Sequence, residues 1–252
     1  MPASRVVTVL TFNIHHAEGT DGRLDLDRVA KVMRSSGADV IGLQEVDRHY
    51  SERSNWADEA RGLARRMHMH VVFAANIDNP PPAEGRPRIQ YGTAILSRFP
   101  ILSWSNTYLF RSPDQEQRGL LQATLDVNGV RVQAFNTHLA ASSAVDRAVQ
   151  AQQIEDIIGR TTDPTFLTGD MNATADAPEI KTLASFLTDS WTVAGVGPGN
   201  TIESGDPTKR IDYVFTNDYA RPMVDRVVQT DPTASDHLPV AATMLLNGTV
   251  AP

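Results

Sequence analysis

The segment VVTVLTFNI at residues 6–14 is apolar on both faces of an extended chain. Successive side chains of a strand point to opposite faces, so Val7 and Val9 lie on one side and Leu10 and Phe12 on the other. A strand of this kind is buried on both sides. The segment therefore favours a layered fold in which other elements cover both faces of the sheet.

Helical and extended patterns alternate through the first third of the chain. Apolar residues at helical spacing predict a helix from Leu26 that ends at Gly37, where glycine suits a left-handed cap. The run DVIGLQEV at 39–46 predicts a strand. A second amphipathic helix is expected from Trp56 to Met67.

The middle of the chain changes to hairpins. Residues 91–139 predict successive strands, and Asn128-Gly129 supplies the positive φ angles of a tight turn between two of them. The later elements are expected as a helix near 148–158, the strand FLTGD at 166–170, a helix opened by Pro178, and strands near 211–215, 223–229 and 238–245.

Two segments, 76–90 and 192–210, are predicted as long loops, and the first of them contains four prolines. Helices that flank strands in each half, with hairpins between them, predict two face-packed sheets covered by helices outside. We expect residues 1–252 to form one domain of this α/β class.

Composition limits the function and the location. Lys and Arg total 23 against 30 Asp and Glu, and a formal charge of -7 argues mildly against a dedicated nucleic-acid binder, which usually has a basic face. The absence of cysteine excludes disulfides and thiolate zinc sites. The apolar N-terminal run is too short for a signal peptide, and no stretch reaches the length of a membrane helix. We expect a cytoplasmic protein without membrane insertion, or a secreted one if a longer precursor exists.

Polar residues stand at the ends of almost all the apolar strands. These residues are Asn13, Glu45, His138, Asp170 with Asn172, Asp212, and Asp236 with His237. Asp170 and Asn172 are two positions apart, as are Asn136 and His138, so an extended backbone points each pair to one side. Both pairs are expected to face one cleft.

Each of these residues alone has a plainer explanation, such as a turn former, a helix cap or a solvated strand end. Their joint occurrence at strand ends favours a shared site. Four converging carboxylates, those of Glu45, Asp170, Asp212 and Asp236, would oppose folding unless a cation lies among them. Oxygen donors without cysteine favour Mg²⁺, with Mn²⁺ or Ca²⁺ as alternatives, and such an ion suits phosphoester hydrolysis.

Seven strings carry a resemblance to a known family. They are TFNIHH at 11–16, LQEVD at 43–47, YGTAILSRFP at 91–100, NTHL at 136–139, GDMNA at 169–173, RIDYVF at 210–215 and SDHLP at 235–239. In order and approximate spacing they resemble the signatures of the endonuclease/exonuclease/phosphatase family, over residues 5–246. The resemblance implies a deoxyribonuclease I-like fold, a four-layered α/β/β/α sandwich of two mixed, mainly antiparallel sheets. It places the active site at one edge, between the sheets.

The resemblance also implies a metal site and a residue that activates water. Glu45 would be the principal metal ligand, with Asn13 and Asp236 beside it. Asp170 would orient or deprotonate the attacking water, helped by Asn172.

The remaining residues would contact the phosphate. His237 would touch the scissile phosphate while hydrogen-bonded to Asp212, and His138 would stabilise the transition state or assist the leaving group. Arg118 matches more loosely and either holds a substrate phosphate or forms a surface salt bridge. Two further candidates either line the substrate pocket or support it from the core, namely His15 and His16.

Three functions compete on this evidence. The first is metal-dependent hydrolysis of a phosphodiester or phosphomonoester in a small molecule or lipid headgroup, by a monomer. The second is a nuclease acting on DNA or RNA, and the third is a non-catalytic binding module, which the complete set of site residues disfavours. The arginines available for a nuclease groove are Arg48, Arg53, Arg65, Arg66, Arg86, Arg88 and Arg98.

Overall fold

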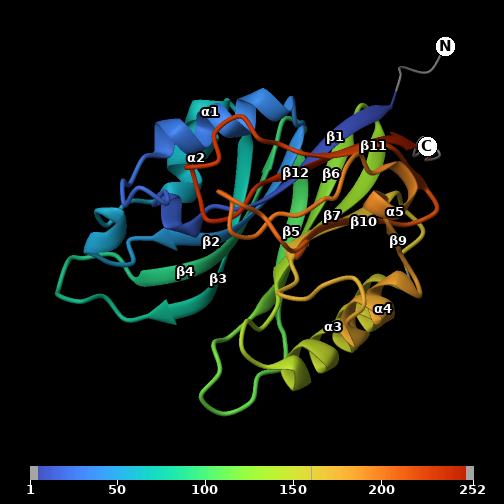
Figure 1. Ribbon diagram of the computed structural model, residues 1–252. Helices are drawn as coiled ribbons and strands as arrows, with labels where there is room; N and C mark the ends of the chain where they lie inside the picture. Colours follow the sequence, from blue (N-terminus) through green and yellow to red (C-terminus); the bar gives the residue numbers. More distant parts are fainter. Residues whose placement is uncertain (1–4, 160, 248–252) are drawn as a thin grey trace.

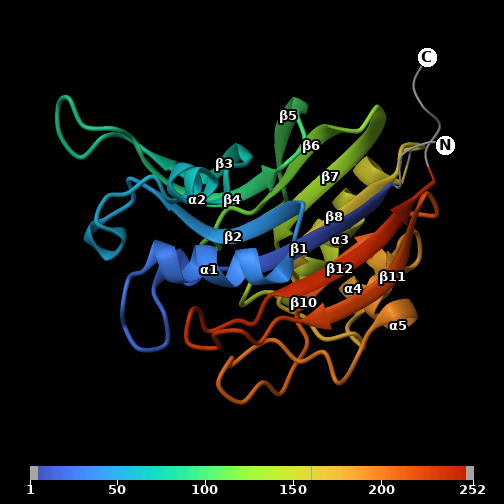
Figure 2. The same cartoon turned by 90° about the horizontal axis from the view of Figure 1, so that it is seen from above.

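The computed structural model describes residues 5–159 and 161–247 and consists of two six-stranded sheets packed face to face (Figure 1). The sequence-based prediction of one domain over residues 1–252 includes positions outside these described residues. The longer helices lie on the outer side of each sheet, as the view from above also shows (Figure 2). In the described part of the chain, no helix is both long and apolar enough to cross a membrane.

The first sheet has the strand order β11-β12-β1-β2-β4-β3. Its strands are β1 (Val6–Asn13), β2 (Val40–Arg48), β3 (His70–Asn79), β4 (Ile89–Ser97), β11 (Ala220–Val227) and β12 (Val240–Leu246). Only the β1–β2 pair is parallel among the pairings of this sheet in the described residues. Its outer face carries α1 (Leu26–Ser36) and α2 (Glu59–Met67), and two short 3-10 turns follow β1 and β2, η1 (His15–Ala17) and η2 (Glu52–Ser54).

The second sheet has the order β5-β6-β7-β8-β10-β9. Its strands are β5 (Ile101–Tyr108), β6 (Gly119–Val127), β7 (Val130–His138), β8 (Thr165–Asp170), β9 (Thr188–Asp189) and β10 (Asp212–Thr216). Here β7 and β8 form the parallel pair. The helices of this half are α3 (Ala144–Ile158), α4 (Pro178–Ala184) and α5 (Ser190–Ala194). Both sheets are thus mixed and mainly antiparallel, as predicted.

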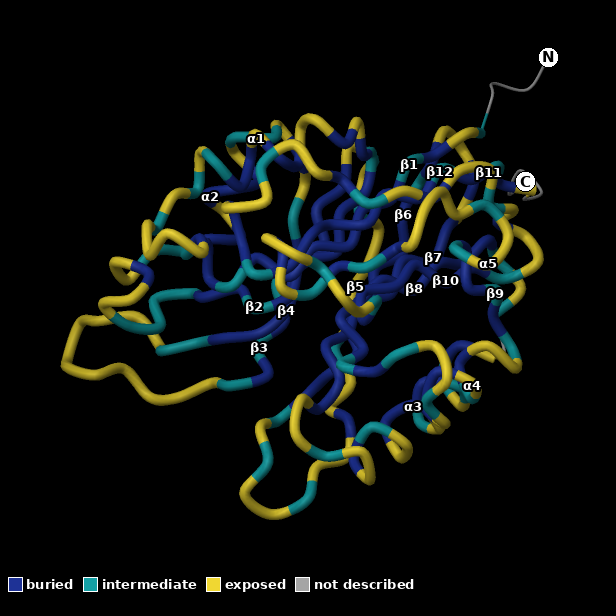
Figure 3. Tube along the Cα trace, in the orientation of Figure 1, coloured by how far each residue is buried: buried dark blue, intermediate teal, exposed yellow. Residues whose placement is uncertain are grey.

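Three apolar layers separate the four layers of backbone. Val7 and Val9 of β1 lie in the layer between the sheets, while Leu10 and Phe12 lie in the layer under α1 and α2. A third layer, which includes Phe135, joins the second sheet to α3 and α4. The tube view shows the inner strands of both sheets as the buried centre of the molecule, while much of the edge strand β5 is exposed (Figure 3). The two-faced pattern of residues 6–14 and the predicted α/β/β/α sandwich are therefore confirmed.

Local signals were accurate where the backbone needed a special conformation. Gly37 ends α1 with φ 72°, and Asn128 and Gly129 connect β6 to β7 with φ angles of 53° and 83°. The expected start of the second helix at Trp56 is wrong. The helix begins at Glu59 because Asp58 caps it, with its side chain accepting a hydrogen bond from the backbone N–H of Arg61.

The proline-rich loop is shorter than the sequence indicated. Pairing of β3 with β4 continues to the Asn79–Ile89 pair, so residues 76–79 and 89–90 are strand and the loop covers 80–88. The second predicted loop is interrupted at its start by α5 and is otherwise irregular to residue 211.

A polar contact joins the two sheets near one end. The side-chain amide of Asn136 on β7 donates hydrogen bonds to the carbonyl oxygens of Leu43 (2.8 Å) and Ala94 (3.0 Å) of the first sheet. Its oxygen accepts from Nε2 of Gln44 at 2.6 Å. These bonds use both ends of the buried Asn136 amide, so the expectation that it faces a cleft beside His138 is wrong. It connects β7 to β2 and β4 instead.

Gly42 permits the close approach of the sheets at this contact. A Cβ atom at Gly42 would lie 2.1 Å from Oγ1 of Thr168 and 2.8 Å from Oδ1 of Asn136. We predict that Gly42→Ala lowers the free energy of unfolding by about 1–3 kcal/mol or more, because the sheets must move apart. Chemical denaturation of the two proteins measures this difference in the free energy of unfolding. Gly205→Ala is the matched control, since no atom lies within 4 Å of its Cβ, and equal effects of the two substitutions would contradict the prediction.

Candidate active site

Three site residues form one row across the second sheet. His138 at the end of β7 is the register partner of Asp170 at the end of β8, and Asp170 is the partner of Asp212 at the start of β10. All three side chains are buried. The parallel β7–β8 pair brings two strand ends to the same edge, and antiparallel β10 begins there. The order and directions of β7, β8 and β10 therefore place the three side chains in one row.

The first sheet faces this row with Asn13 and Glu45. Asn13 ends β1 on the face that Val7 and Val9 direct between the sheets, and its Nδ2 donates to Oδ2 of Asp170 at 3.0 Å and to Oε1 of Glu45 at 3.2 Å. The pairing of β2 with β4 shifts register between Leu43 and Val46, and Glu45 has φ 56°. This bulge directs Glu45 toward Asn13.

The segment from Ser235 to His237 completes the site from a loop. Oγ of Ser235 donates to the backbone oxygen of Asn13 at 2.8 Å and accepts from the backbone N–H of His237 at 3.2 Å. Ser235 also contacts Oδ1 of Asp236 at 3.2 Å. The sequence reading did not assign a role to Ser235, although its place in the SDH string was the available signal.

The long loop before β10 supports this segment. The backbone N–H of Ser204 donates to the carbonyl oxygen of Asp236 at 2.9 Å, and Oγ of Ser204 donates to that of Ser235 at 2.7 Å. Ile202 forms an isolated bridge with His237. The loop predicted at 192–210 thus holds the segment from Ser235 to His237 in place through hydrogen bonds.

The predicted pair of Asp212 and His237 is present. Nδ1 of His237 lies 2.9 Å from Oδ2 of Asp212, and Nε2 lies 3.7 Å from Oδ2 of Asp170. Burial by itself lowers the pKa of His237, but the charge and hydrogen bond of Asp212, with Asp170 and Asp236, outweigh burial and raise the pKa to about 10. His237 is therefore protonated at neutral pH.

Asp170 is surrounded by the other site residues. Its Oδ1 accepts from the backbone N–H of Asn172 at 2.9 Å, and Oδ2 lies 3.4 Å from Nε2 of His138. Burial, together with the charge of Asp212, raises the pKa of Asp170 to about 7, although His237 and Asn13 act in the opposite direction. The carboxyl group can therefore exchange a proton near neutral pH.

His138 is held as a neutral ring between polar groups. Nη1 of Arg118 lies 2.9 Å from its Nδ1, and a guanidinium only donates. Burial, with Arg118 and His237 nearby, keeps the pKa of His138 well below its ordinary value. Nδ2 of Asn172 lies 3.0 Å from Nε2 of this ring.

Arg118 is not a surface residue. It is buried, and its guanidinium also pairs with Glu116 at 2.8 Å. The sequence left two roles open for Arg118, a contact with a substrate phosphate or a surface salt bridge. A salt bridge with Glu116 is present, but the guanidinium is buried and lies against His138.

His15 and His16 lie at the other side of the site, in the turn after β1. The backbone N–H of His15 donates to Oδ1 of Asn13 at 3.1 Å, and side-chain donor atoms of both histidines lie near Glu45. Burial, with Arg53 and His15 nearby, lowers the pKa of His16. The structure therefore brings the catalytic and metal-ligand candidates named from the sequence into one connected region, whereas Asn136 lies between the sheets.

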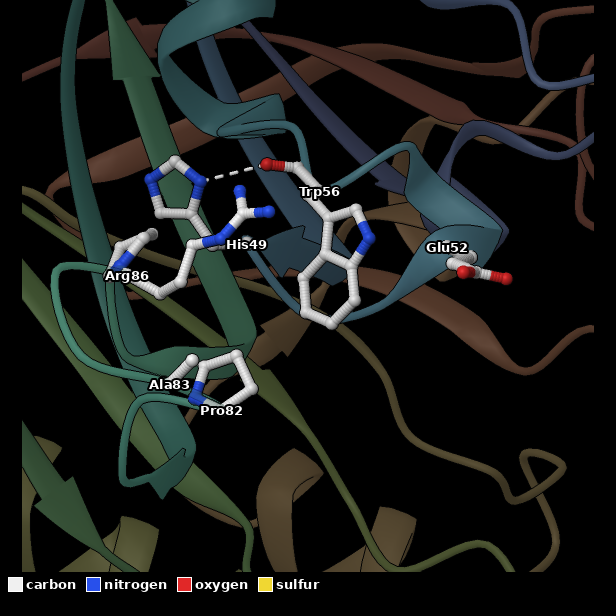
Figure 4. Close-up of a pocket in the computed structure, with 7 residues that line it drawn as sticks. His49, Glu52, Trp56, Pro82, Ala83 and Arg86 are labelled. Carbon is white, nitrogen blue, oxygen red and sulfur yellow. Dashed lines mark hydrogen bonds between the residues drawn. The ribbon is translucent and has the colours of Figure 1, made fainter.

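A separate cavity of about 550 Å³ lies beyond the end of β2, between the η2 turn and the 80–88 loop (Figure 4). Nδ1 of His49 donates to the backbone oxygen of Trp56 at 2.8 Å, and the Arg86 side chain extends from the opposite loop toward both residues. His49 follows Glu45 by four residues, which is about 13 Å along a strand. The cavity is thus on the site edge of the first sheet, outside the charged row.

The two-sheet fold and the charged row between its sheets define a phosphoester hydrolase. The sequence pattern described as the Endonuclease/Exonuclease/phosphatase family matches residues 10–237, and the chain belongs to this family. Members of the family generally use a divalent metal, and both the Asp170–Asp212–His237 group and the His15–His16–Glu45 group have donor atoms close enough for one ion. No curated protein matches the chain in sequence.

Several solved structures are similar. An endonuclease/exonuclease/phosphatase from Beutenbergia cavernae DSM 12333 has 27% identity and a TM-score of 0.83, with 98% of this chain and 72% of that chain covered. A mannosyl-6-phosphatase from Bacteroides thetaiotaomicron VPI-5482 has 18% identity and a TM-score of 0.75, over 95% and 100%. Truncated TDP2 from Caenorhabditis elegans has 21% identity and a TM-score of 0.68, over 95% and 98%. At 18% and 21% identity, the last two structures show a similarity of fold alone.

The charge of Asp212 gives a prediction that needs no substrate. We expect Asp212→Asn to lower the pKa of His237 by about 1 to 3 pH units, because burial then acts against the imidazolium with less opposition. Histidine NMR titration measures the shift. The exposed His70 serves as an internal control in both proteins, and an unchanged midpoint for His237 would mean that Asp212 does not hold its proton.

Proposed function

We propose that this chain hydrolyses a phosphomonoester or phosphodiester of a small molecule or lipid headgroup, with Mg²⁺ as its ion and Mn²⁺ or Ca²⁺ as possible replacements. The observation that carries the proposal is the pairing of two unlike surfaces. Glu45 offers carboxylate oxygens on one side, beside the amide of Asn13, and the protonated His237 lies with Asp170 and His138 on the other. A phosphate between them would meet a cation from one side and N–H donors from the other.

The residues present fit a hard divalent ion. Glu45 is half-buried and keeps one carboxylate oxygen toward Asn13, and Asp236 is tied to Asn13 through Ser235. Carboxylate and amide oxygens are the ligands that Mg²⁺ prefers. When bound, the ion would polarise a phosphoryl oxygen and offset the charge that develops on it.

The chain's own groups would carry the proton movements. We infer that Nε2 of His237 donates to a phosphate oxygen while Asp212 holds Nδ1, which fixes the ring and its charge. Asp170, whose Oδ1 is oriented by the backbone of Asn172, would orient water and accept its proton. His138 would contact the transition state through the Nε2 edge of its ring, because Arg118 occupies the other ring nitrogen.

The charges around the site favour a small substrate over nucleic acid. Most of the arginines that were candidates for a basic groove form ion pairs with aspartates, which leaves them little charge for phosphates of a long chain. These pairs are Arg48–Asp58, Arg53–Asp47, Arg66–Asp27, Arg88–Asp78 and Arg98–Asp39. The excess of acidic residues agrees with this preference.

The proposal predicts that hydrolysis needs both the ion and the proton carriers. Chelation should abolish turnover and Mg²⁺ should restore it, while Asp170→Asn and His237→Ala should each lower kcat by about 100- to 10,000-fold. Turnover of a panel of small phosphomonoesters, small phosphodiesters and lipids measures the effect. Asp218→Asn, an exposed aspartate, is the control. Full activity of either site variant would exclude this mechanism.

The same panel decides between the competing functions. Rapid nicking of plasmid DNA or cleavage of RNA by trace enzyme, with slow turnover of small phosphoesters, would favour the nuclease. Binding of a phosphoester without turnover under any of the three ions would favour the non-catalytic module.

The cavity beside Trp56 offers a place for a ring remote from the scissile phosphate, with Arg86 available for a negative group (Figure 4). We predict that Trp56→Ala raises KM roughly 10-fold for a preferred substrate, equivalent to about 1.4 kcal/mol of binding, and leaves kcat unchanged. Steady-state kinetics measures both constants. Tyr219→Ala removes another exposed aromatic ring and should change neither. An unaltered KM in Trp56→Ala would remove the cavity from substrate binding.

A further inference from the structure

The turn after β1 places two histidines beside Glu45. One ring nitrogen from each of His15 and His16 and one carboxylate oxygen of Glu45 lie within 4.8 Å of one another. The two ring centroids are 4.5 Å apart. Two imidazoles and a carboxylate at this spacing form a set of donors different from a set made of carboxylate oxygens alone.

His15 is prepared to bind through one nitrogen. Its Nδ1 lies 3.1 Å from the backbone oxygen of Glu18, and because a carbonyl oxygen only accepts, Nδ1 carries the ring proton. The lone pair of a neutral ring is then on Nε2. A backbone carbonyl that holds the far nitrogen in this way is the usual arrangement around a metal-binding histidine.

His16 contains a polar atom that lacks a partner. The residue is 7% exposed, and its Nδ1 is buried without any hydrogen bond. Its other nitrogen, Nε2, lies 3.6 Å from a carboxylate oxygen of Glu18. A buried polar atom without a partner destabilises the fold, and a ligand at Nδ1 would relieve this cost.

The backbone that presents these groups is strained. His15, His16 and Ala17 are consecutive and have φ angles of 45°, 41° and 58°, and Glu45 has φ 56°. A residue other than glycine is unfavourable in this left-handed conformation. Strain of this kind persists where the surroundings hold it, and it gathers at ligand sites.

We propose that His15, His16 and Glu45 bind a first-row transition-metal dication of the Zn²⁺ kind. Imidazole nitrogen suits these ions, whereas Mg²⁺ selects oxygen. Three protein ligands leave a position open for water or for a phosphate oxygen. The inference rests on the proposed function for the use of this ion in hydrolysis, but the binding itself is measured without substrate.

The test is calorimetric titration of the chelator-treated full chain with Zn²⁺ in the presence of excess Mg²⁺. We expect one equivalent of Zn²⁺ to bind despite the Mg²⁺, and His15→Asn and His16→Asn each to weaken the affinity at least about 10-fold. Asparagine is chosen because it tolerates the left-handed backbone of these positions. Thermal unfolding of each variant shows whether it is folded, and Zn²⁺ should raise the melting temperature of the unsubstituted chain more than that of either variant.

Two controls locate the ion. His70→Asn removes an exposed histidine, and His237→Asn removes the imidazole from the Asp170–Asp212–His237 group; both should retain the Zn²⁺ equivalent. Loss of binding in His237→Asn with retention in the His15 and His16 variants would assign the ion to the other group and overturn the proposal. Displacement of Zn²⁺ by Mg²⁺ would also overturn it. Hydrolysis supported by Mg²⁺ alone is assayed separately, so failure here leaves the proposed function standing.

Discussion

The site depends on two buried aspartates that lie directly opposite each other. Asp170 and Asp212 are register partners on adjacent strands, and both are shielded from solvent. Like charges in this arrangement oppose pairing of the strands, and burial adds to the cost. The protonated ring of His237 offsets much of that repulsion through its 2.9 Å contact with Asp212, and the amide of Asn13 bonds to Asp170. The loop that carries His237 thus stabilises the pairing of β8 with β10.

The two sheets are held at the distance that this arrangement needs. Asn136 bonds across to the backbone of β2 and β4, and Gly42 leaves room for Thr168 and Asn136 to approach β2. A short step further along β2, the bulge turns Glu45 toward Asn13. A continuous register would alternate Glu45 to the helix side, where Leu43 and Val46 lie. A small irregularity in pairing therefore decides where the principal oxygen donor points.

Two kinds of side chain surround Glu45, one on each side. Oxygen donors lie on the side of Asn13, and imidazole nitrogens lie on the side of His15 and His16. Farther along the same edge, the cavity beside Trp56 is walled by two loops that contribute little to either sheet. Charge and strain are thus concentrated where strands end, while recognition of the rest of a substrate is left to loops, which vary without disturbing the core.

The sequence by itself determined the layered fold, because hydrophobic alternation reports which faces of a strand are buried and Asn128-Gly129 permits one kind of turn. It also indicated which polar residues stand at strand ends, since polarity at such positions is a local property. Only the tertiary structure decided that Asn136 lies between the sheets, that Trp56 precedes its helix, and that Ser235 joins Asn13 to His237. These features depend on register, a bulge and the packing of distant segments, which are set by contacts between residues far apart in the chain and leave no periodic trace along it.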